Sequence, residues 1–230
     1  MEHCRNCENP IINNDSFCGA CGQSTKSFDR PAWQVGKDTF HELLDIDGRL
    51  FTTLKTLLIK PGLLTLEYNQ GKRQKYSPPL RMYLVMSILF FVVFEFFGRD
   101  VFVNTPSLLP MQAYYPKIIF VLLPAFAGIL QLFYFRTYYI SNLIFAIHLH
   151  TFVYLVMMLI FPLEQIAESS IIALLVQAIL FFYFFGYLLK ALKLNYQQNW
   201  GWTIAKFIAI TTCYLQLLVL SFRGVEYFLL

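Results

Sequence analysis

The sequence is poor in charge. Only 14% of its 230 residues are charged and 57% are hydrophobic, whereas soluble domains average about 25% charged residues. The deficit is uneven, because residues 1–79 carry most of the charged side chains and residues 82–230 consist of long apolar runs with short polar breaks. This pattern excludes an ordinary soluble protein and predicts a polar front followed by a membrane domain.

Several motifs are also missing. The sequence has no P-loop, nucleophile elbow or dinucleotide fingerprint, so no motif indicates nucleotide-dependent or serine-hydrolase chemistry. Residues 1–30 lack the apolar stretch of a secretory signal peptide. We therefore expect the first membrane segment to act as the targeting signal.

Long apolar stretches are abundant. Five of them reach spanning length, at about residues 80–97, 118–135, 143–161, 171–189 and 204–222. Nineteen helical residues rise about 28 Å, close to the ~30 Å hydrocarbon core of a bilayer. The sequence thus predicts an all-α integral membrane protein with five transmembrane helices in contact with the lipid bilayer.

Lysine and arginine indicate the orientation of these spans. With the N-terminus in the cytoplasm, the inner flanks hold eight such cations (Lys72, Arg73, Lys75, Arg81, Arg136, Lys190, Lys193, Lys206) and the outer flanks three (Arg99, Lys117, Arg223). The positive-inside rule favours this arrangement. Five spans then place the C-terminus outside.

Four cysteines precede the membrane part. Cys4, Cys7, Cys18 and Cys21 fit the spacing C-x2-C-x10-C-x2-C, in which two knuckles direct four thiolates at one centre, as in tetrahedral structural zinc sites. Two disulfides, a redox dithiol and an iron–sulfur cluster are the alternatives. The cytoplasmic location disfavours disulfides, and the spacing is not typical of iron–sulfur proteins. The sequence therefore predicts one structural Zn2+ per chain in a zinc ribbon.

The predicted ribbon suits a protein partner better than nucleic acid. Arg5 is the only basic residue between its cysteines, so the positive patch that a nucleic-acid interface needs is missing. We expect a cytoplasmic protein partner at the ribbon, and a homo-oligomer remains open.

The segment between ribbon and membrane has two amphipathic stretches. Residues 33–47 align Asp38, His41, Glu42 and Asp45 on one helical face. This face is either an ordinary solvated face or a site that binds a second metal or does acid–base chemistry. Residues 49–59 line one side with Leu50, Phe51, Leu54, Leu57 and Leu58, and a second helix restarts after Pro61. These helices either lie in the membrane interface or pack on the ends of the spans.

A group of cations follows. We call Lys72, Arg73, Lys75 and Arg81 the basic collar. Cations beside an anionic membrane each contribute about 1 kcal/mol, so the collar is either a plain orientation anchor or a site for anionic lipid phosphates. The predicted domains are then the ribbon at 1–26, the juxtamembrane segment at 27–79 and the membrane domain at 80–230.

Few polar side chains interrupt the spans. Glu95, His148 and His150 are the intramembrane candidates for function. The two histidines are about 200° apart on one helix at 100° per residue. One helix therefore cannot direct both at one metal, and we expect hydrogen bonds between helices or contacts with lipid headgroups instead.

The region before and into the first span resembles a known family. Pro61-Gly62, Tyr68, Gly71-Lys72-Arg73, Tyr76 and Pro78-Pro79, preceded by the cysteine ribbon, are similar to the signature of a bacterial membrane family described only as a domain of unknown function. The resemblance covers residues 1–100. It implies a bacterial cytoplasmic (inner) membrane location and supplies no mechanism.

Three functions fit these features. The first is a membrane-anchored adaptor or assembly factor that docks partners on its zinc ribbon. The second is a transporter, channel or lipid-handling protein with an anionic headgroup site at the basic collar. The third is a membrane enzyme that uses Asp38, His41, Glu42 and Asp45. A polar cavity between spans favours the second, and a closed apolar bundle favours the first.

Overall fold

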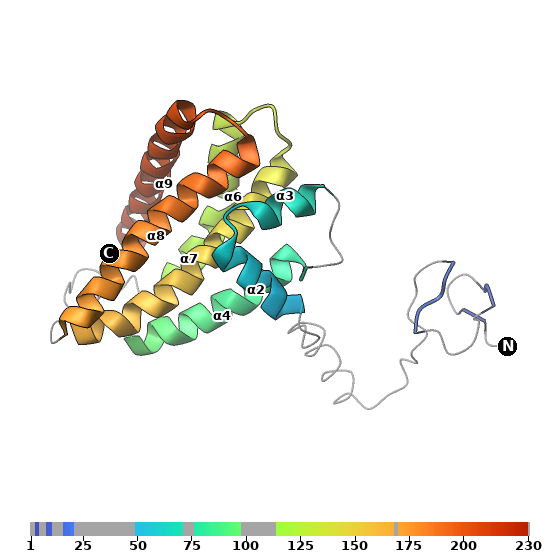
Figure 1. The fold of residues 1–230 in the computed structure, drawn as a ribbon, viewed down its shortest axis with the longest axis horizontal. Helices are drawn as coiled ribbons and strands as arrows, with labels where there is room; N and C mark the ends of the chain where they lie inside the picture. The colour runs from blue at the N-terminus through green and yellow to red at the C-terminus, as the bar shows by residue number, and fades with distance from the viewer. Residues whose placement is uncertain are drawn as a thin grey trace. The chain divides into compact units, whose positions relative to one another are not determined.

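The computed structural model describes residues 3–4, 8–10, 16–20, 49–70, 76–97, 114–167 and 170–229. The chain divides into two units, Met1–Leu43 and Leu44–Leu230. The described part of the second unit is built of helices (Figure 1): α2 Arg49–Ile59, α3 Leu63–Asn69, α4 Pro79–Phe97, α6 Tyr115–Phe133, α7 Tyr139–Ala167, α8 Ile171–Tyr196 and α9 Trp200–Leu229. In the first unit, the described residues form one isolated bridge, between His3 and Pro10.

Helices α4, α6, α7, α8 and α9 coincide with the five predicted spans. Four stretches are long and apolar enough to cross a membrane: Pro79–Phe97, Tyr139–Glu164, Ile171–Tyr196 and Trp200–Val225. This confirms an all-helical, multi-pass membrane protein. The apolar run of α6, Ile118–Phe133, is shorter. Its 16 residues rise about 24 Å, less than the ~30 Å core, so the predicted count of five spans is not confirmed.

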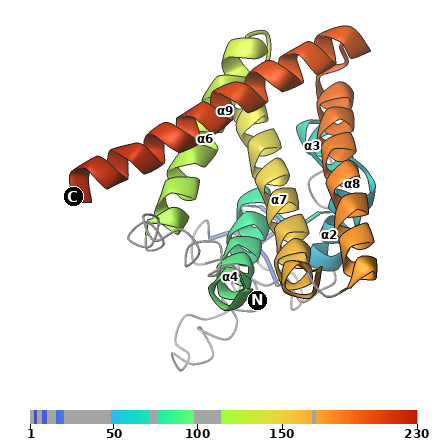
Figure 2. The ribbon, with the colours of Figure 1, turned by 90° about the vertical axis from the view of Figure 1, so that its left-hand side faces the viewer.

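Helix α7 is the centre of the bundle. It contacts α4, α6 and α8, and also the short helices α2 and α3, as Figure 2 shows for the long helices around it. Stacked rings make much of the contact. The ring centroids of Phe90 and Tyr154 lie 4.6 Å apart, and those of Phe152 and Tyr187 lie 3.5 Å apart. Because lipid provides no hydrophobic drive between helices, van der Waals packing of this kind is one of the attractions that hold them together.

Helices α2 and α3 pack on the bundle, as one of the two predicted placements requires. The Tyr187 hydroxyl donates to the carbonyl of Leu57 at 2.5 Å, and the Tyr183 hydroxyl donates to that of Leu58. The turn between α2 and α3 contains Gly62 at φ +74°, where a Cβ would lie 2.8 Å from the carbonyl oxygen of Ala191. Only glycine allows both the left-handed backbone and this close approach to α8.

The side chains of the predicted apolar face of α2 differ in burial. Leu57 is buried, but Phe51 is 73% exposed, and the polar Thr53 is fully buried in its place. The Thr53 hydroxyl donates to the carbonyl of Arg49 at 2.6 Å and accepts the backbone N–H of Ser77 at 2.9 Å. A buried N–H just before α4 needs an acceptor, since an unpaired one costs about 1–3 kcal/mol. That requirement explains a threonine on this face.

Candidate functional site

The predicted zinc ligands are partly within the described residues. Cys4 and Cys18 are both buried, at 3% and 4% exposure, and the carbonyl of Cys4 accepts the N–H of Glu8 in a tight turn at 2.8 Å. Cys7 and Cys21 lie outside the described residues, and no group of three or more metal-ligating side chains occurs among those described. The zinc ribbon therefore stays a prediction.

Most other polar candidates from the first 80 residues also lie outside the described part. This holds for Lys72, Arg73 and Lys75 of the basic collar and for the acidic stripe (Asp38, His41, Glu42, Asp45). Arg81 is half-buried in the first turn of α4, and Glu95 is exposed near the end of that helix.

The two intramembrane histidines point to different neighbours, as their spacing predicts. Nδ1 of His148 lies 2.8 Å from the hydroxyl of Thr65 on α3. His150 instead places Nδ1 2.8 Å from the carbonyl of Ala146 and Nε2 3.0 Å from the hydroxyl of Tyr214 on α9. A carbonyl only accepts, so Nδ1 of His150 is the donor and its Nε2 accepts the Tyr214 proton. Both histidines therefore join helices by hydrogen bonds, which confirms the prediction.

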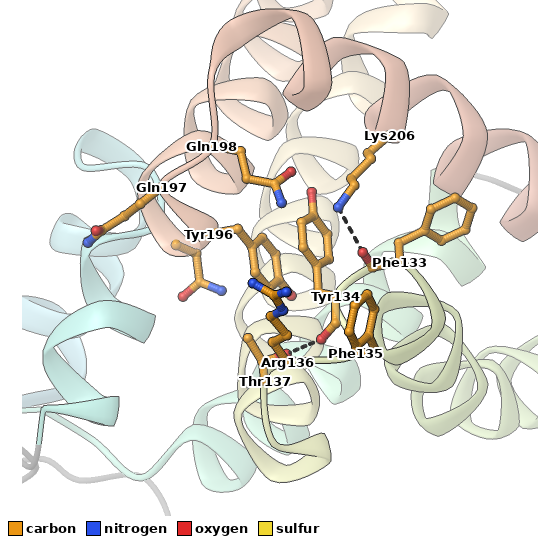
Figure 3. Close-up of a pocket in the computed structure, with 10 residues that line it drawn as sticks. Phe133, Tyr134, Phe135, Arg136, Thr137, Tyr196, Gln197, Gln198 and Lys206 are labelled. Carbon is orange, nitrogen blue, oxygen red and sulfur yellow. Dashed lines mark hydrogen bonds between the residues drawn. The ribbon is translucent and has the colours of Figure 1, made fainter.

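A site that the sequence did not reveal lies at the end of the bundle where two connections meet. The α6–α7 connection, residues 134–138, and the α8–α9 connection, residues 197–199, enclose a cavity of about 460 Å³. We call this cavity the basic pocket (Figure 3). Its lining residues are Phe133, Tyr134, Phe135, Arg136, Thr137, Asn195, Tyr196, Gln197, Gln198 and Lys206.

Two stacked tyrosines and a lysine form the wall of the basic pocket. The rings of Tyr134 and Tyr196 are parallel, with centroids 3.4 Å apart. The Lys206 ammonium lies 4.4 Å from the Tyr134 ring centroid and donates to the carbonyl of Phe133 at 2.8 Å. The Lys206 ammonium and the Tyr134 ring thus form a cation–π contact.

A hydrogen-bond network holds the two connections in place. The Asn142 amide nitrogen donates to Oε1 of Gln131 at 2.9 Å, while its Oδ1 accepts from the hydroxyls of Tyr196 at 2.7 Å and Thr137 at 3.1 Å. Asn142 is fully buried. Helices α6, α7 and α8 thus share one satisfied polar cluster, which positions the pocket wall.

A second hollow adjoins the first. It measures about 520 Å³, is lined by Pro61, Lys190, Lys193, Leu194, Gln197 and Trp200, and shares Gln197 with the basic pocket. The lining residues of the two hollows that the structure describes include four cations, Arg136, Lys190, Lys193 and Lys206, and no carboxylate. The result is a positive region whose ammonium and guanidinium groups suit phosphate or carboxylate oxygens.

The basic pocket also contains an unsatisfied acceptor. Oε1 of Gln198 is buried and has no hydrogen-bond partner. Buried polar atoms of this kind normally have a partner, so a bound molecule or a water that donates a hydrogen bond fits this position.

The comparisons with known proteins add a family match. Residues 47–91 match the family described as "Protein of unknown function (DUF3667)". The matched stretch contains α2, α3 and the first part of α4, so it includes Thr65 and Gly62, which contact the later helices. No curated protein and no solved structure matches the chain.

Each cation of the basic pocket was counted in the sequence only as an inner-flank charge. Arg136 and Lys206 are 70 residues apart along the chain, and their approach depends on how α6 and α9 pack. The only local signal is the pairing of aromatic and basic residues in "FYFRTYY" and "KLNYQQNWGW", which is equally typical of an interfacial belt.

Proposed function

We propose that the protein is a multi-pass membrane protein that binds phosphate groups of anionic lipids at the basic pocket. The observation that carries this proposal is the convergence of Arg136 and Lys206 on one cavity whose described lining has no carboxylate. A planar guanidinium binds two phosphate oxygens at once, whereas an ammonium acts as a point charge with three donors. Arg136 can therefore orient a bound phosphate, and both side chains balance its negative charge.

The wider charge pattern supports the same function. Lys190 and Lys193 add cations in the adjoining hollow. We extend the proposal to the basic collar, of which Lys72, Arg73 and Lys75 precede α4 in the sequence and Arg81 lies in its first turn. The positive-inside count favours the cytoplasmic face for these groups, with the N-terminus inside and the C-terminus outside, and the family resemblance favours a bacterial inner membrane. Anionic lipids attract such cations most strongly at that face.

The test is binding of a fluorescent phosphatidic acid to the purified full-length protein in zwitterionic nanodiscs. Arg136→Gln removes one exposed cation and should weaken binding about fivefold, since a cation near anionic lipid contributes about 1 kcal/mol. Arg136→Lys keeps the charge and should lie between the parent and Arg136→Gln. Added salt should reduce the difference, because it screens exposed charges.

Arg223→Gln is the matched control. Arg223 is also exposed, but it lies near the other end of α9 from Lys206, so its loss should leave binding unchanged. Equal affinities for the parent, Arg136→Gln and Arg223→Gln would contradict the proposal, as would equal binding of phosphatidylcholine.

A second candidate function is that of an adaptor or assembly factor. The cysteine spacing supports it, because a closed zinc ribbon is a compact docking module without an open coordination position. The apolar lining of the cavity between α7, α8 and α9 also favours it over passage of a polar solute. In-cell crosslinking from the ribbon, compared between the parent and Cys7→Ser, tests it, because loss of the metal should abolish a ribbon-specific product. The same products from both proteins would exclude a ribbon-dependent partner.

A further inference from the structure

A third cavity, which is apolar, lies between helices of the bundle. Its volume is about 280 Å³, and its walls come mainly from α7, α8 and α9, with Leu188, Leu192, Phe207 and Ile210 among the lining residues. It approaches the ~300 Å³ lower limit of small-molecule pockets and is about twice an apolar cavity that holds benzene. The only polar side chains among its described lining are His150, Thr211 and Tyr214.

Two rows of side chains join this cavity to the basic pocket. On α8, Leu188, Leu192 and Tyr196 follow one another at four-residue spacing, and on α9 Lys206, Ile210 and Tyr214 do the same, so each row lies along one side of its helix. Tyr196 and Lys206 line the basic pocket, while the other four line the cavity. From Lys206 to Tyr214 the helix rises about 12 Å. The cavity therefore begins directly below the basic pocket.

The cavity opens on the lipid side. Helices α8 and α9 diverge from their short connection (Figure 2), and Leu215, which lines the cavity, is 52% exposed. A hydrocarbon chain that enters between the two helices thus reaches the cavity without passing through the buried side chains under the basic pocket.

The polar side chains of His150 and Tyr214 in the cavity wall already have hydrogen-bond partners. The hydrogen of the Tyr214 hydroxyl is directed to Nε2 of His150, and the other ring nitrogen of that histidine donates to Ala146. Polar groups that already have partners do not need a bound water to satisfy them. If the cavity is empty, the atoms of its walls lack dispersion contacts on one side. A hydrocarbon chain restores those contacts.

We propose that the basic pocket and this cavity form one binding site for a lipid phosphate that has a long hydrocarbon chain. The phosphate lies against Arg136 and Lys206, and the chain lies between α8 and α9 with its middle carbons beside Leu188 and Tyr214. The inference rests on the proposed phosphate-binding function and adds the position of the chain. Phosphate chemistry alone does not separate a lipid from a soluble phosphate ester, so the experiment includes both.

The test uses a single-chain alkyl phosphate with a diazirine about 12 Å from the phosphorus, the helix rise derived above. The probe is photolysed with the full-length protein in zwitterionic nanodiscs, and the labelled residues are mapped by mass spectrometry. We expect labels on cavity-lining residues of α7, α8 and α9. Excess dodecyl phosphate should reduce these labels about tenfold, whereas dodecanol, which has the chain without the phosphate, should not.

Two cavity-filling variants test the position of the chain. Leu188→Trp and Val153→Phe enlarge lining side chains from two different helices, and each should reduce the competed labels about tenfold. Leu174→Trp is the control, because Leu174 is 52% exposed on α8 and is not among the cavity-lining residues. That variant should label like the parent.

Butyl phosphate, followed by phosphorus NMR, measures the phosphate half of the site alone. If the parent binds butyl phosphate but both filling variants keep the competed labels, the chain position is wrong and the proposed function stands. If the parent binds neither butyl phosphate nor the long-chain probe, the proposed function fails and the inference fails with it. Binding of butyl phosphate with no competed label on the parent would assign the pocket to soluble phosphate esters and overturn the inference.

Discussion

Gly62→Ala should separate α3 from α8. Gly62 has φ +74° and a missing Cβ that would lie 2.8 Å from the carbonyl oxygen and 3.0 Å from Cα of Ala191. Both atoms belong to the backbone of a long helix, so neither can rotate away as a side chain would. The added methyl group therefore has to move α3 and the turn before it.

The magnitude follows from three contributions. A left-handed backbone costs a non-glycine residue about 1–2 kcal/mol. Overpacking against an immobile wall costs about 1–3 kcal/mol. Alanine also restricts the unfolded chain, which offsets about 0.4–1 kcal/mol. The net loss is about 3 kcal/mol, which for a chain of this size lowers Tm by about 6–12 °C.

The assay is thermal unfolding of the purified protein in detergent, followed by tryptophan fluorescence. Gly186→Ala is the matched control, because Gly186 lies in α8 and no heavy atom lies within 4 Å of its added Cβ. In a helix interior this control should be neutral or stabilise by up to about 1 kcal/mol. If Gly62→Ala and Gly186→Ala have the same Tm as the parent, the contact between the α2–α3 turn and α8 is not as described.

Three further predictions follow from other contacts. Thr65→Val removes the hydrogen-bond partner of the buried His148 and should lower the free energy of unfolding by about 1–3 kcal/mol in the same assay. Thr65→Ser keeps the hydroxyl and should cost less stability. Equal losses in the two variants would show that the hydrogen bond is unimportant. Metal analysis should find one Zn2+ per chain with Zn–S near ~2.3 Å. The Cys7→Ser and Cys21→Ser variants should lose this zinc, and Cys213→Ser should keep it. A Cys4–Cys7 disulfide in fresh cells would exclude the site. In chains without the other reactive cysteines, an external thiol reagent should label Leu230→Cys and not Lys26→Cys, and the reverse pattern would invert the orientation.

The helices could be predicted from the sequence because the apolar residues that specify each helix lie within that helix. The predicted span at 171–189 corresponds to α8, and the predicted span at 80–97 corresponds to α4. Helix α7 begins at Tyr139 and ends at Ala167, beyond the predicted 143–161 at both ends, since a helix does not stop where its apolar run stops. Phe51 is 73% exposed and Thr53 is buried, because Thr53 accepts the N–H of Ser77, a contact from outside the helix that the pattern of α2 does not record.

The sequence by itself determined the class of this protein and the direction of its two intramembrane histidines. In lipid every backbone N–H and C=O needs a partner within its own segment, so long apolar runs have little alternative to the helix, and the 100° step per residue then separates His148 from His150. Only the tertiary structure decided which groups meet. Thr65 and His148 are 83 residues apart and Lys206 lies 73 residues from Phe133, and such pairs depend on how whole helices pack. The basic pocket and the apolar cavity below it exist because α8 and α9 share one short connection and then diverge, a geometry that no local pattern in the chain records.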